Sequence, residues 1–228
     1  VVGASYIALE CGGFLHGLGC HVTIMVRSIF LRGFDQQIAN KIGDYMEKSG
    51  VKFIKKAVPI KIELNSAGRK VVTFKQGKTN LGLFDTVLFA IGRSAETKSI
   101  GLEEVGVKVA ENGKILASED DKTSVDNIYA IGDVCHGRLE LTPTAIMAGR
   151  LLAARLFNNK TALMSYKYVP TTVFTPIDMA AADIGKEARK VFGAENIVAY
   201  GSVFKPLEWN MNYEREDDCY AKLVTHKT

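Results

Sequence analysis

The chain has 228 residues, a formal net charge of +4, and 47% hydrophobic against 24% charged residues. This is the composition of an ordinary globular protein, and the length suffices for one large or two smaller buried cores. The charge is too mild to indicate nucleic-acid binding, and no apolar run approaches the ~20 residues of a membrane span. We therefore expect neither a nucleic acid nor a membrane as a partner.

The number and spacing of the cysteines indicate the cellular compartment and whether a metal site is present. The four cysteines form neither a Cys-x-x-Cys pair nor a metal-binding spacing, so we expect no metal site. They are Cys11, Cys20, Cys135 and Cys219. These cysteines, together with the lack of a recognisable signal peptide, are typical of reduced thiols in a cytoplasmic or, alternatively, a mitochondrial protein.

The first segment predicts a strand end, a tight turn and a helix. Val1 and Val2 end the strand, Gly3 forms the turn, and a helix is expected from about Ser5 to Leu18. The apolar stripe expected on this helix consists of Ile7, Cys11, Phe14, Leu15 and Leu18. This pattern is the phosphate-binding start of a Rossmann βαβ unit, although serine and alanine replace its second and third glycines.

The second strand is predicted from His21 to Val26, with Arg27 directly at its end and Arg32 five residues further on. An enzyme that uses NAD commonly carries an acidic residue here, about 20 residues past the first glycine, to bind the ribose 2′-hydroxyl. Two guanidinium groups suit a 2′-phosphate instead. The sequence therefore favours NADPH, and the alternative is that both arginines lie in an ordinary solvated loop.

The next elements complete an α/β unit. Asp35 is expected to cap a helix that Gly50 ends. Four strands are then predicted, and the last of them is apolar almost throughout, which is typical of a buried parallel strand. They run from Val51 to Ile54, Val58 to Leu64, Lys70 to Phe74 and Phe84 to Ala90. A hairpin connection at Asn65–Gly68 joins the middle two strands.

A second segment repeats the pattern of strand and helix. A buried strand is predicted from Asn127 to Ala130, and Gly132 and Asp133 follow it. Thr142 is then expected as the cap of a helix that has Pro143 at its first position.

The last part of the chain changes to strands with one short helix, expected from Lys186 to Phe192. The strand from Cys219 to Val224 is predicted to have no partner, and only two residues precede Gly3. We therefore expect the sequence to be a piece of a longer protein.

Five segments follow one another in a characteristic order. They are Gly3 to Glu10, Ala90 to Arg93, Tyr129 to Asp133, Leu141 to Arg150, and Val169 to Pro176. In this order they resemble the two-dinucleotide-binding flavoprotein disulfide reductases, and they span nearly the whole chain. Within that family the animal-type thioredoxin reductases and thioredoxin-glutathione reductases are the most similar, because of Val26-Arg27-Ser28, Leu31 to Asp35, and Pro206 to Trp209.

The resemblance implies an α/β fold in three parts. Residues 1–95 would form a Rossmann-like NADPH-binding domain, residues 96–166 the C-terminal part of an FAD-binding domain, and residues 167–228 the start of an α+β dimer-interface domain. NADPH would reduce FAD, the flavin would reduce an enzyme disulfide, and a C-terminal pair would pass electrons to thioredoxin, which maintains redox homeostasis. The redox dithiol would precede Val1 and the His-Glu pair would follow Thr228, so no catalytic residue is expected here.

The matching segments also carry the expected cofactor contacts. Gly3 and Ser5 would meet the pyrophosphate, Tyr6 would cover the flavin, and Glu10 would bind the carboxamide. Asp133 would accept a hydrogen bond from the flavin ribityl group. The complete set is Gly3, Ser5, Tyr6, Ile7, Glu10, Arg27, Arg32, Ala90, Gly92, Arg93, Asp133, Glu140, Leu141, Thr142 and Val173.

Simpler alternatives accompany these assignments. Gly92 and Arg93 would face the nicotinamide nucleotide or form a capping turn, and packing explains Glu140, Leu141 and Val173 equally well. Two other functions stay open: a glutathione-disulfide reductase, disfavoured by Ser28, and a non-catalytic NADPH-binding module. Homodimerisation and a glutathione or glutaredoxin partner are further implications. The chain alone is expected to bind NADPH, hold FAD weakly and lack disulfide reductase activity.

Overall fold

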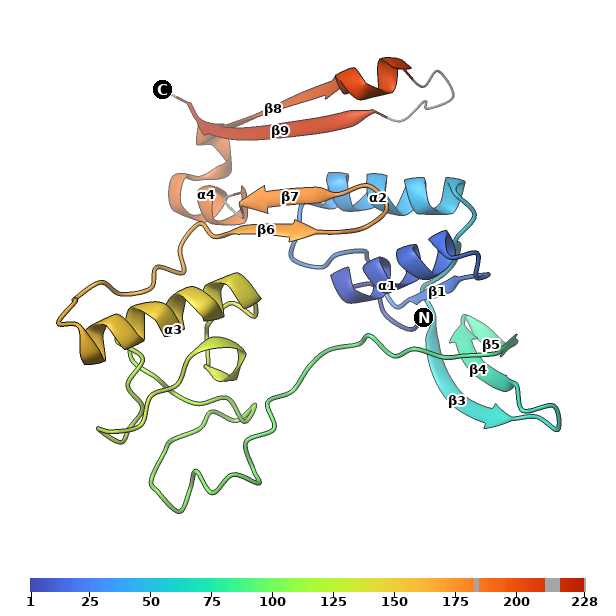
Figure 1. Cartoon of the computed structure of the whole chain (residues 1–228). Helices are drawn as coiled ribbons and strands as arrows, with labels where there is room; N and C mark the ends of the chain where they lie inside the picture. The colour runs from blue at the N-terminus through green and yellow to red at the C-terminus, as the bar shows by residue number, and fades with distance from the viewer. Residues whose placement is uncertain (183–184, 212–217, 228) are drawn as a thin grey trace. The chain divides into compact units, whose positions relative to one another are not determined.

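The computed structural model describes residues 1–182, 185–211 and 218–227 of the chain (Figure 1). Two compact units are present. The first unit consists of Val1–Ile91 together with Pro170–Thr228, and the second unit is Gly92–Val169. The division of the sequence into three domains stays a prediction.

A parallel β-sheet forms the centre of the first unit. β1 (Thr23–Val26) pairs with β2 (Lys52–Lys55), and Val2 bridges to Met25 on one side and to Phe89 on the other. Across the sheet the order is therefore β2, β1, the segment around Val2 and the segment around Phe89. Numbered along the chain this is 3-2-1-4, the order with which a Rossmann fold begins.

α1 (Tyr6–Gly17) packs against this sheet through small side chains. Its buried residues are Ala8, Leu9, Gly12 and Gly13. The predicted apolar stripe was wrong, because Phe14 and Leu18 are exposed. The reason is the closeness of the sheet: a Cβ atom on Gly12 would lie 2.6 Å from Ile24 Cδ1. Such close packing selects small side chains, which hydrophobic periodicity does not reveal.

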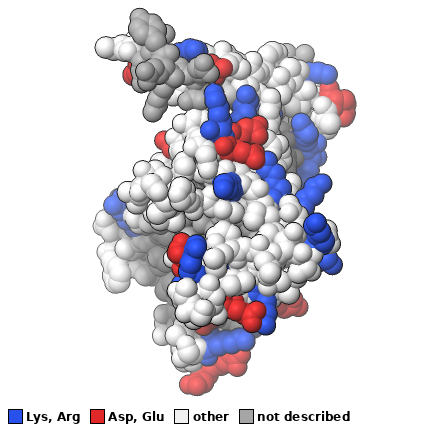
Figure 2. All heavy atoms as spheres, turned by 90° about the vertical axis from the view of Figure 1, so that its right-hand side faces the viewer, with Lys and Arg blue, Asp and Glu red and all other residues white. Residues whose placement is uncertain are grey.

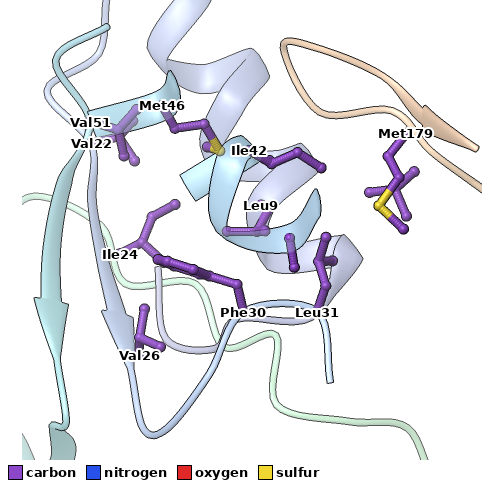
Figure 3. Packing of buried hydrophobic residues seen from close by; sticks show 12 residues of the cluster. Leu9, Val22, Ile24, Val26, Phe30, Leu31, Ile42, Met46, Val51 and Met179 are labelled. Atoms are coloured by element: carbon purple, nitrogen blue, oxygen red, sulfur yellow. The ribbon is translucent and has the colours of Figure 1, made fainter. Parts of the chain in front are cut away.

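α2 (Gln36–Lys48) connects β1 to β2 and begins as predicted. The Asp35 carboxylate accepts hydrogen bonds from the N–H groups of Gln37 and Ile38, at 3.0 and 3.1 Å. Gly50 follows the last turn with φ +111°, a conformation that favours glycine. Figure 3 shows the side chains that α1, α2 and β1 bury together. They include Leu9, Ile24, Phe30, Leu31, Ile42 and Met46.

Three antiparallel strands follow β2, namely β3 (Val58–Leu64), β4 (Lys70–Gln76) and β5 (Lys78–Phe84). The hairpin between β3 and β4 is confirmed, since Asn65 Oδ1 accepts hydrogen bonds from two N–H groups of the turn, at 3.0 and 2.9 Å. The strand expected from Phe84 to Ala90 was wrong. Phe84 belongs to β5, and Phe89 forms only a bridge to Val2 and is 49% exposed. The segment around Val2 is too short to pair with more of residues 85–90, so no regular strand forms there.

The C-terminal part of the first unit contains two hairpins. β6 (Pro170–Val173) pairs with β7 (Met179–Ala182), and Val173 and Met179 join the core that contains Leu9. α4 (Gly185–Phe192) and the 3₁₀ helix η2 (Ala194–Asn196) lead to β8 (Ile197–Phe204), η3 (Leu207–Met211) and β9 (Cys219–His226). The expectation that this last strand lacks a partner was wrong. β9 pairs with β8 along its whole length, and such long-range pairing is not visible in the strand's own residues.

The second unit contains the 3₁₀ helix η1 (Gly132–Val134) and α3 (Thr142–Phe157). Its core consists of Val107, Ile115, Ala130 and Cys135. The strand expected from Asn127 to Ala130 was wrong, since only a bridge between Lys122 and Tyr129 forms there. Within the described residues no helix is both long and apolar enough to span a membrane.

α3 begins one residue earlier than expected. Leu141 is the N-cap residue and Thr142 already belongs to the helix, so Pro143 is the second helical residue. No side chain caps this end. The hydroxyl that stabilises the turn is that of Thr144, which donates to the Leu141 carbonyl at 2.7 Å.

Candidate dinucleotide-binding sites

The carboxyl ends of the parallel strands meet at one edge of the first unit, where open α/β sheets bind their ligands. Gly3 follows the segment around Val2, Arg27 follows β1, and Ala90 ends the segment around Phe89. Gly3 has φ +133°, and a Cβ atom on it would lie 2.2 Å from the Ala90 carbonyl oxygen. Only glycine fits this turn. Two of the predicted residues, Gly3 and Ala90, are therefore brought into contact.

α1 directs its N-terminus toward this edge. Ser5 is the N-cap residue, but its side chain does not cap the helix; its hydroxyl lies 3.4 Å from the Ala90 carbonyl oxygen. The first N–H groups of a helix have no intrahelical partner and carry the positive end of the helix dipole. The exposed residues Tyr6 and Ile7 surround this end. The arrangement suits a phosphate group.

The loop that leaves β1 carries the two arginines. Arg27, Ser28 and Arg32 are exposed. Arg32 Nη2 donates a hydrogen bond to Ser28 Oγ at 2.7 Å. By contrast, Phe30 and Leu31 point into the core between α1 and α2 (Figure 3). The loop therefore presents two guanidinium groups and a hydroxyl on a buried apolar base.

Glu10 makes a long-range contact that sequence reasoning did not predict. Its Oε1 accepts a hydrogen bond from the Phe174 N–H at 2.7 Å, which joins α1 to the end of β6. Phe174 follows Val173, whose side chain is fully buried in the core. Tyr6, one helical turn before Glu10, is 37% exposed. Two predicted residues, Glu10 and Val173, are thereby brought close together, and Tyr6 lies one helical turn before Glu10.

A second group of predicted residues lies within the second unit. Asp133 is exposed and follows Gly132, whose φ is +71°. A Cβ atom on Gly132 would lie 3.1 Å from Ala145 Cβ, so the backbone beside Asp133 packs closely on α3. Thr142 opens α3 without a side-chain cap. The unit therefore combines an exposed carboxylate with an uncapped helix N-terminus, which is suited to a ligand with a hydroxyl group and a developing negative charge.

Two neighbours of that site have structural partners. Glu140 forms an ion pair with Lys114. Cys135 is buried, and its burial raises the pKa of the thiol above the ordinary value; Asp121 raises it further, while Arg138 and Lys114 oppose the shift. A raised pKa disfavours the reactive thiolate. Cys135 therefore serves packing in this unit.

Gly92 and Arg93 are exposed and begin the second unit. Gly92 has φ +148°, and a Cβ atom there would meet no other atom within 4 Å. Its conformation, rather than crowding, accounts for the glycine. Their contact with a cofactor stays a prediction.

The surface charge is mixed. Figure 2 shows Lys and Arg side chains lying among Asp and Glu on one face. One ordered pair joins the N-cap residue of α2 to β9, where Lys222 Nζ lies 2.6 Å from Asp35 Oδ2. Partial burial alone would raise the pKa of Asp35, but the hydrogen bond from Lys222 and those from Ile38 and Gln37 lower it below the ordinary value.

Sequence reasoning missed one polar residue of the first unit, Gln36. Its side chain turns back into the loop that carries the arginines and contacts three backbone carbonyl groups. The only hint in the sequence is its place directly after the predicted cap, Asp35. The helix propensity of glutamine does not show which backbone carbonyl groups of the preceding loop point toward its side chain.

Strand order, the Gly3 turn and the α1 N-terminus define a dinucleotide-binding α/β protein. The family described as pyridine nucleotide-disulphide oxidoreductase matches residues 1–149. A curated relative, thioredoxin reductase SEP1 of Emiliania huxleyi, is 48% identical over 238 residues. The alignment covers 100% of this chain and 48% of the relative, so the chain spans about half the length of the relative.

The chain therefore belongs to the pyridine nucleotide-disulphide oxidoreductase family. The predicted α/β class with a Rossmann-like unit and the predicted family of flavoprotein disulfide reductases are confirmed. Flavin and pyridine nucleotide are the cofactors of this family in general.

Proposed function

We propose that the chain is part of an NADPH- and FAD-dependent thioredoxin-disulfide reductase of the animal type. The observation that carries the proposal is the pair Arg27 and Arg32 on one loop at the carboxyl end of β1, with Ser28 hydrogen-bonded to Arg32 at 2.7 Å. Guanidinium groups bind a phosphate through charge-assisted hydrogen bonds. The name of the relative that is 48% identical, a thioredoxin reductase, supports the same conclusion.

The first unit fits a pyridine dinucleotide. Gly3 and Ser5 would hold the pyrophosphate at the N-terminus of α1, and Arg27 and Arg32 the 2′-phosphate. Glu10 would orient the nicotinamide carboxamide, and its bond to the Phe174 N–H fixes the carboxylate in place.

The second unit fits part of a flavin site. Asp133 would accept a hydrogen bond from the ribityl chain, and the N-terminus of α3 at Thr142 would face the part of the ring that becomes negative on reduction. When bound, FAD would supply the hydride acceptance that links NADPH to a disulfide. The residues of this chain hold and orient; the groups that exchange electrons with thioredoxin are proposed to lie elsewhere in the protein.

A double variant tests the cofactor assignment. Arg27→Ala with Arg32→Ala should weaken NADPH binding by about 1.5–3 kcal/mol for each lost charge-assisted contact and leave NADH binding nearly unchanged. Titration of the purified chain with both nucleotides measures this. An equal loss for both nucleotides would contradict the assignment to the 2′-phosphate.

A test of the proposed substrate and partner requires the native protein. When it is purified from its source, the protein should be a flavin-containing homodimer of the cytoplasm or mitochondrion. It should reduce thioredoxin with NADPH. Preferential reduction of glutathione disulfide would favour a glutathione reductase, and a flavin-free protein without reductase activity would favour the binding module.

A further inference from the structure

Gln36, the first residue of α2, reaches back into the loop formed by residues 27–34, here called the arginine loop. Its Nε2 lies 3.2 Å from the Phe30 carbonyl oxygen, 3.3 Å from that of Leu31 and 3.1 Å from that of Phe34. Three acceptors surround one group, so that group is the NH₂ of the amide. The NH₂ group has two hydrogens for three carbonyl oxygens, so one hydrogen is shared between two of them.

The arginine loop needs such a donor because of its backbone. Leu31 has φ +44°, which is unusual for a side chain with a Cβ atom, and Gly33 has φ +104°. The Phe34 N–H donates to the Leu31 carbonyl at 3.0 Å. This tight turn directs several carbonyl oxygens to one side, where their negative partial charges repel one another. The Gln36 amide offsets that repulsion.

Other contacts fix the buried side of the arginine loop. The Leu31 N–H donates to the Ala4 carbonyl at 2.8 Å, which joins the loop to the turn before α1. Phe30 packs edge-on against Phe53, with ring centroids 5.0 Å apart. These contacts anchor Phe30 and Leu31 but not the outer half of the loop, where Arg32 lies.

Gln36 holds that outer half. It bonds to Leu31 before Arg32 and to Phe34 after it, so the backbone of Arg32 is held on both sides while its side chain stays exposed. The guanidinium is then close enough to Ser28 for the hydrogen bond of 2.7 Å. A binding group that is already in place loses less conformational freedom when a ligand binds.

We propose that Gln36 is a positioning residue for cofactor specificity: by fixing the arginine loop it sets the preference for a dinucleotide that carries a 2′-phosphate. This inference rests on the proposed function, in which the same loop binds NADPH. Gln36 acts through Arg32 and Ser28 and does not itself touch the cofactor.

The test compares two ligands that differ only by the 2′-phosphate, adenosine 2′,5′-bisphosphate and adenosine 5′-monophosphate. In the purified chain, Gln36→Met keeps the length and removes the donors. Affinity for the bisphosphate should fall about tenfold, because misplacing one guanidinium removes about one charge-assisted hydrogen bond. Affinity for the monophosphate should stay the same. Gln76→Met is the matched control, since Gln76 also donates to a backbone carbonyl, that of Lys55, at 2.8 Å.

The outcomes separate this inference from the proposed function. If the unchanged chain does not prefer the bisphosphate, the proposed cofactor and this inference both fail. If it does prefer the bisphosphate, but Gln36→Met keeps that preference or weakens both ligands equally, only this inference fails. A loss of preference in Gln36→Met but not in Gln76→Met supports it.

A measurement without any substitution covers the case that Gln36→Met does not fold. Amide hydrogen exchange of the unchanged chain should show Phe34, whose N–H closes the turn around Arg32, protected before any ligand is added. Protection that arises only on addition of adenosine 2′,5′-bisphosphate would overturn the inference, because the loop would then be ordered by the ligand rather than by Gln36.

Discussion

The first unit supports its candidate site with apolar packing, and the second unit relies more on buried polar groups. Side chains from α1, α2, β1, β6 and β7 meet in one core of the first unit. The core of the second unit consists of Val107, Ile115, Ala130 and Cys135 among the described residues, three of which are small. Its buried polar residues are Thr97, Asp121 and Thr144.

The hydrogen bonds of these polar residues replace part of the missing apolar contact. Thr97 Oγ1 donates to the Gly113 carbonyl at 2.6 Å. Asp121, with 1% of its side chain exposed, pairs with Arg155 of α3 at 2.5 Å. Apolar contacts are non-directional and tolerate adjustment, whereas a buried charge without its partner is costly. The two units should therefore respond differently to substitution.

The largest effect is expected for Arg155→Met. It leaves the buried Asp121 carboxylate without its charged partner, which should destabilise the second unit by about 3–5 kcal/mol. The first unit should be unaffected. Hydrogen exchange, followed amide by amide in urea, measures the two units separately. Arg150→Met is the control, because Arg150 lies exposed on the same helix. A loss below about 0.5 kcal/mol, typical of surface substitutions, would refute the role of the pair.

An intermediate effect is expected for Gly12→Ala in the first unit. The added Cβ would lie 2.6 Å from Ile24 Cδ1, and Ile24 is fully buried, so overpacking should cost about 1–3 kcal/mol. Gly17→Ala is the matched control on the same helix, since a Cβ there meets nothing within 4 Å. It should stabilise the chain by up to about 1 kcal/mol. Equal urea midpoints for both variants would contradict close packing of α1 on the sheet.

The smallest effect is expected for Asp35, and it is measured as a change in how stability depends on pH. Its folded pKa lies below the ordinary value, so its contribution to stability is present above the unfolded pKa and lost as pH falls through the folded pKa. When the pH falls below about 4, the Asp35→Asn variant should therefore lose less stability than the unchanged chain does. At pH 7 the partly buried pair with Lys222 should account for about 1 kcal/mol or less.

Urea unfolding at several pH values tests this. Lys222→Met should remove a large part of the same acid-dependent stability, because Lys222 donates the 2.6 Å hydrogen bond to Asp35. Identical acid sensitivity in the unchanged chain and both variants would show that Asp35 does not contribute.

The sequence predicted local structure where one segment contains its own determinants. Asp35 was identified as a cap and Asn65–Gly68 as a hairpin turn, because a carboxylate before a helix and a turn-forming residue act on atoms only two to four residues away. The Gly3 turn was identified for the same reason. Its contact with Ala90 belongs to the sheet and could not be predicted from that motif alone.

Predictions failed where distant segments decide the outcome. The buried face of α1 depends on how closely Ile24 approaches, and the pairing of β9 depends on β8. In the candidate site, the positions of Arg27 and Arg32 were predicted, but the role of Gln36 was not. It depends on the direction of three carbonyl groups, which follows from the left-handed backbone of Leu31.

The separation between the buried and the exposed residues of the arginine loop has a consequence for evolution and engineering. Phe30 and Leu31 fix its path from inside, whereas Arg27, Ser28 and Arg32 add nothing to the core. Mutations at these three surface positions can accumulate without loss of folding. On the proposed function, an acidic residue at position 27 would redirect the same scaffold toward NADH, so a lineage could exchange its cofactor through a few substitutions that leave the fold intact.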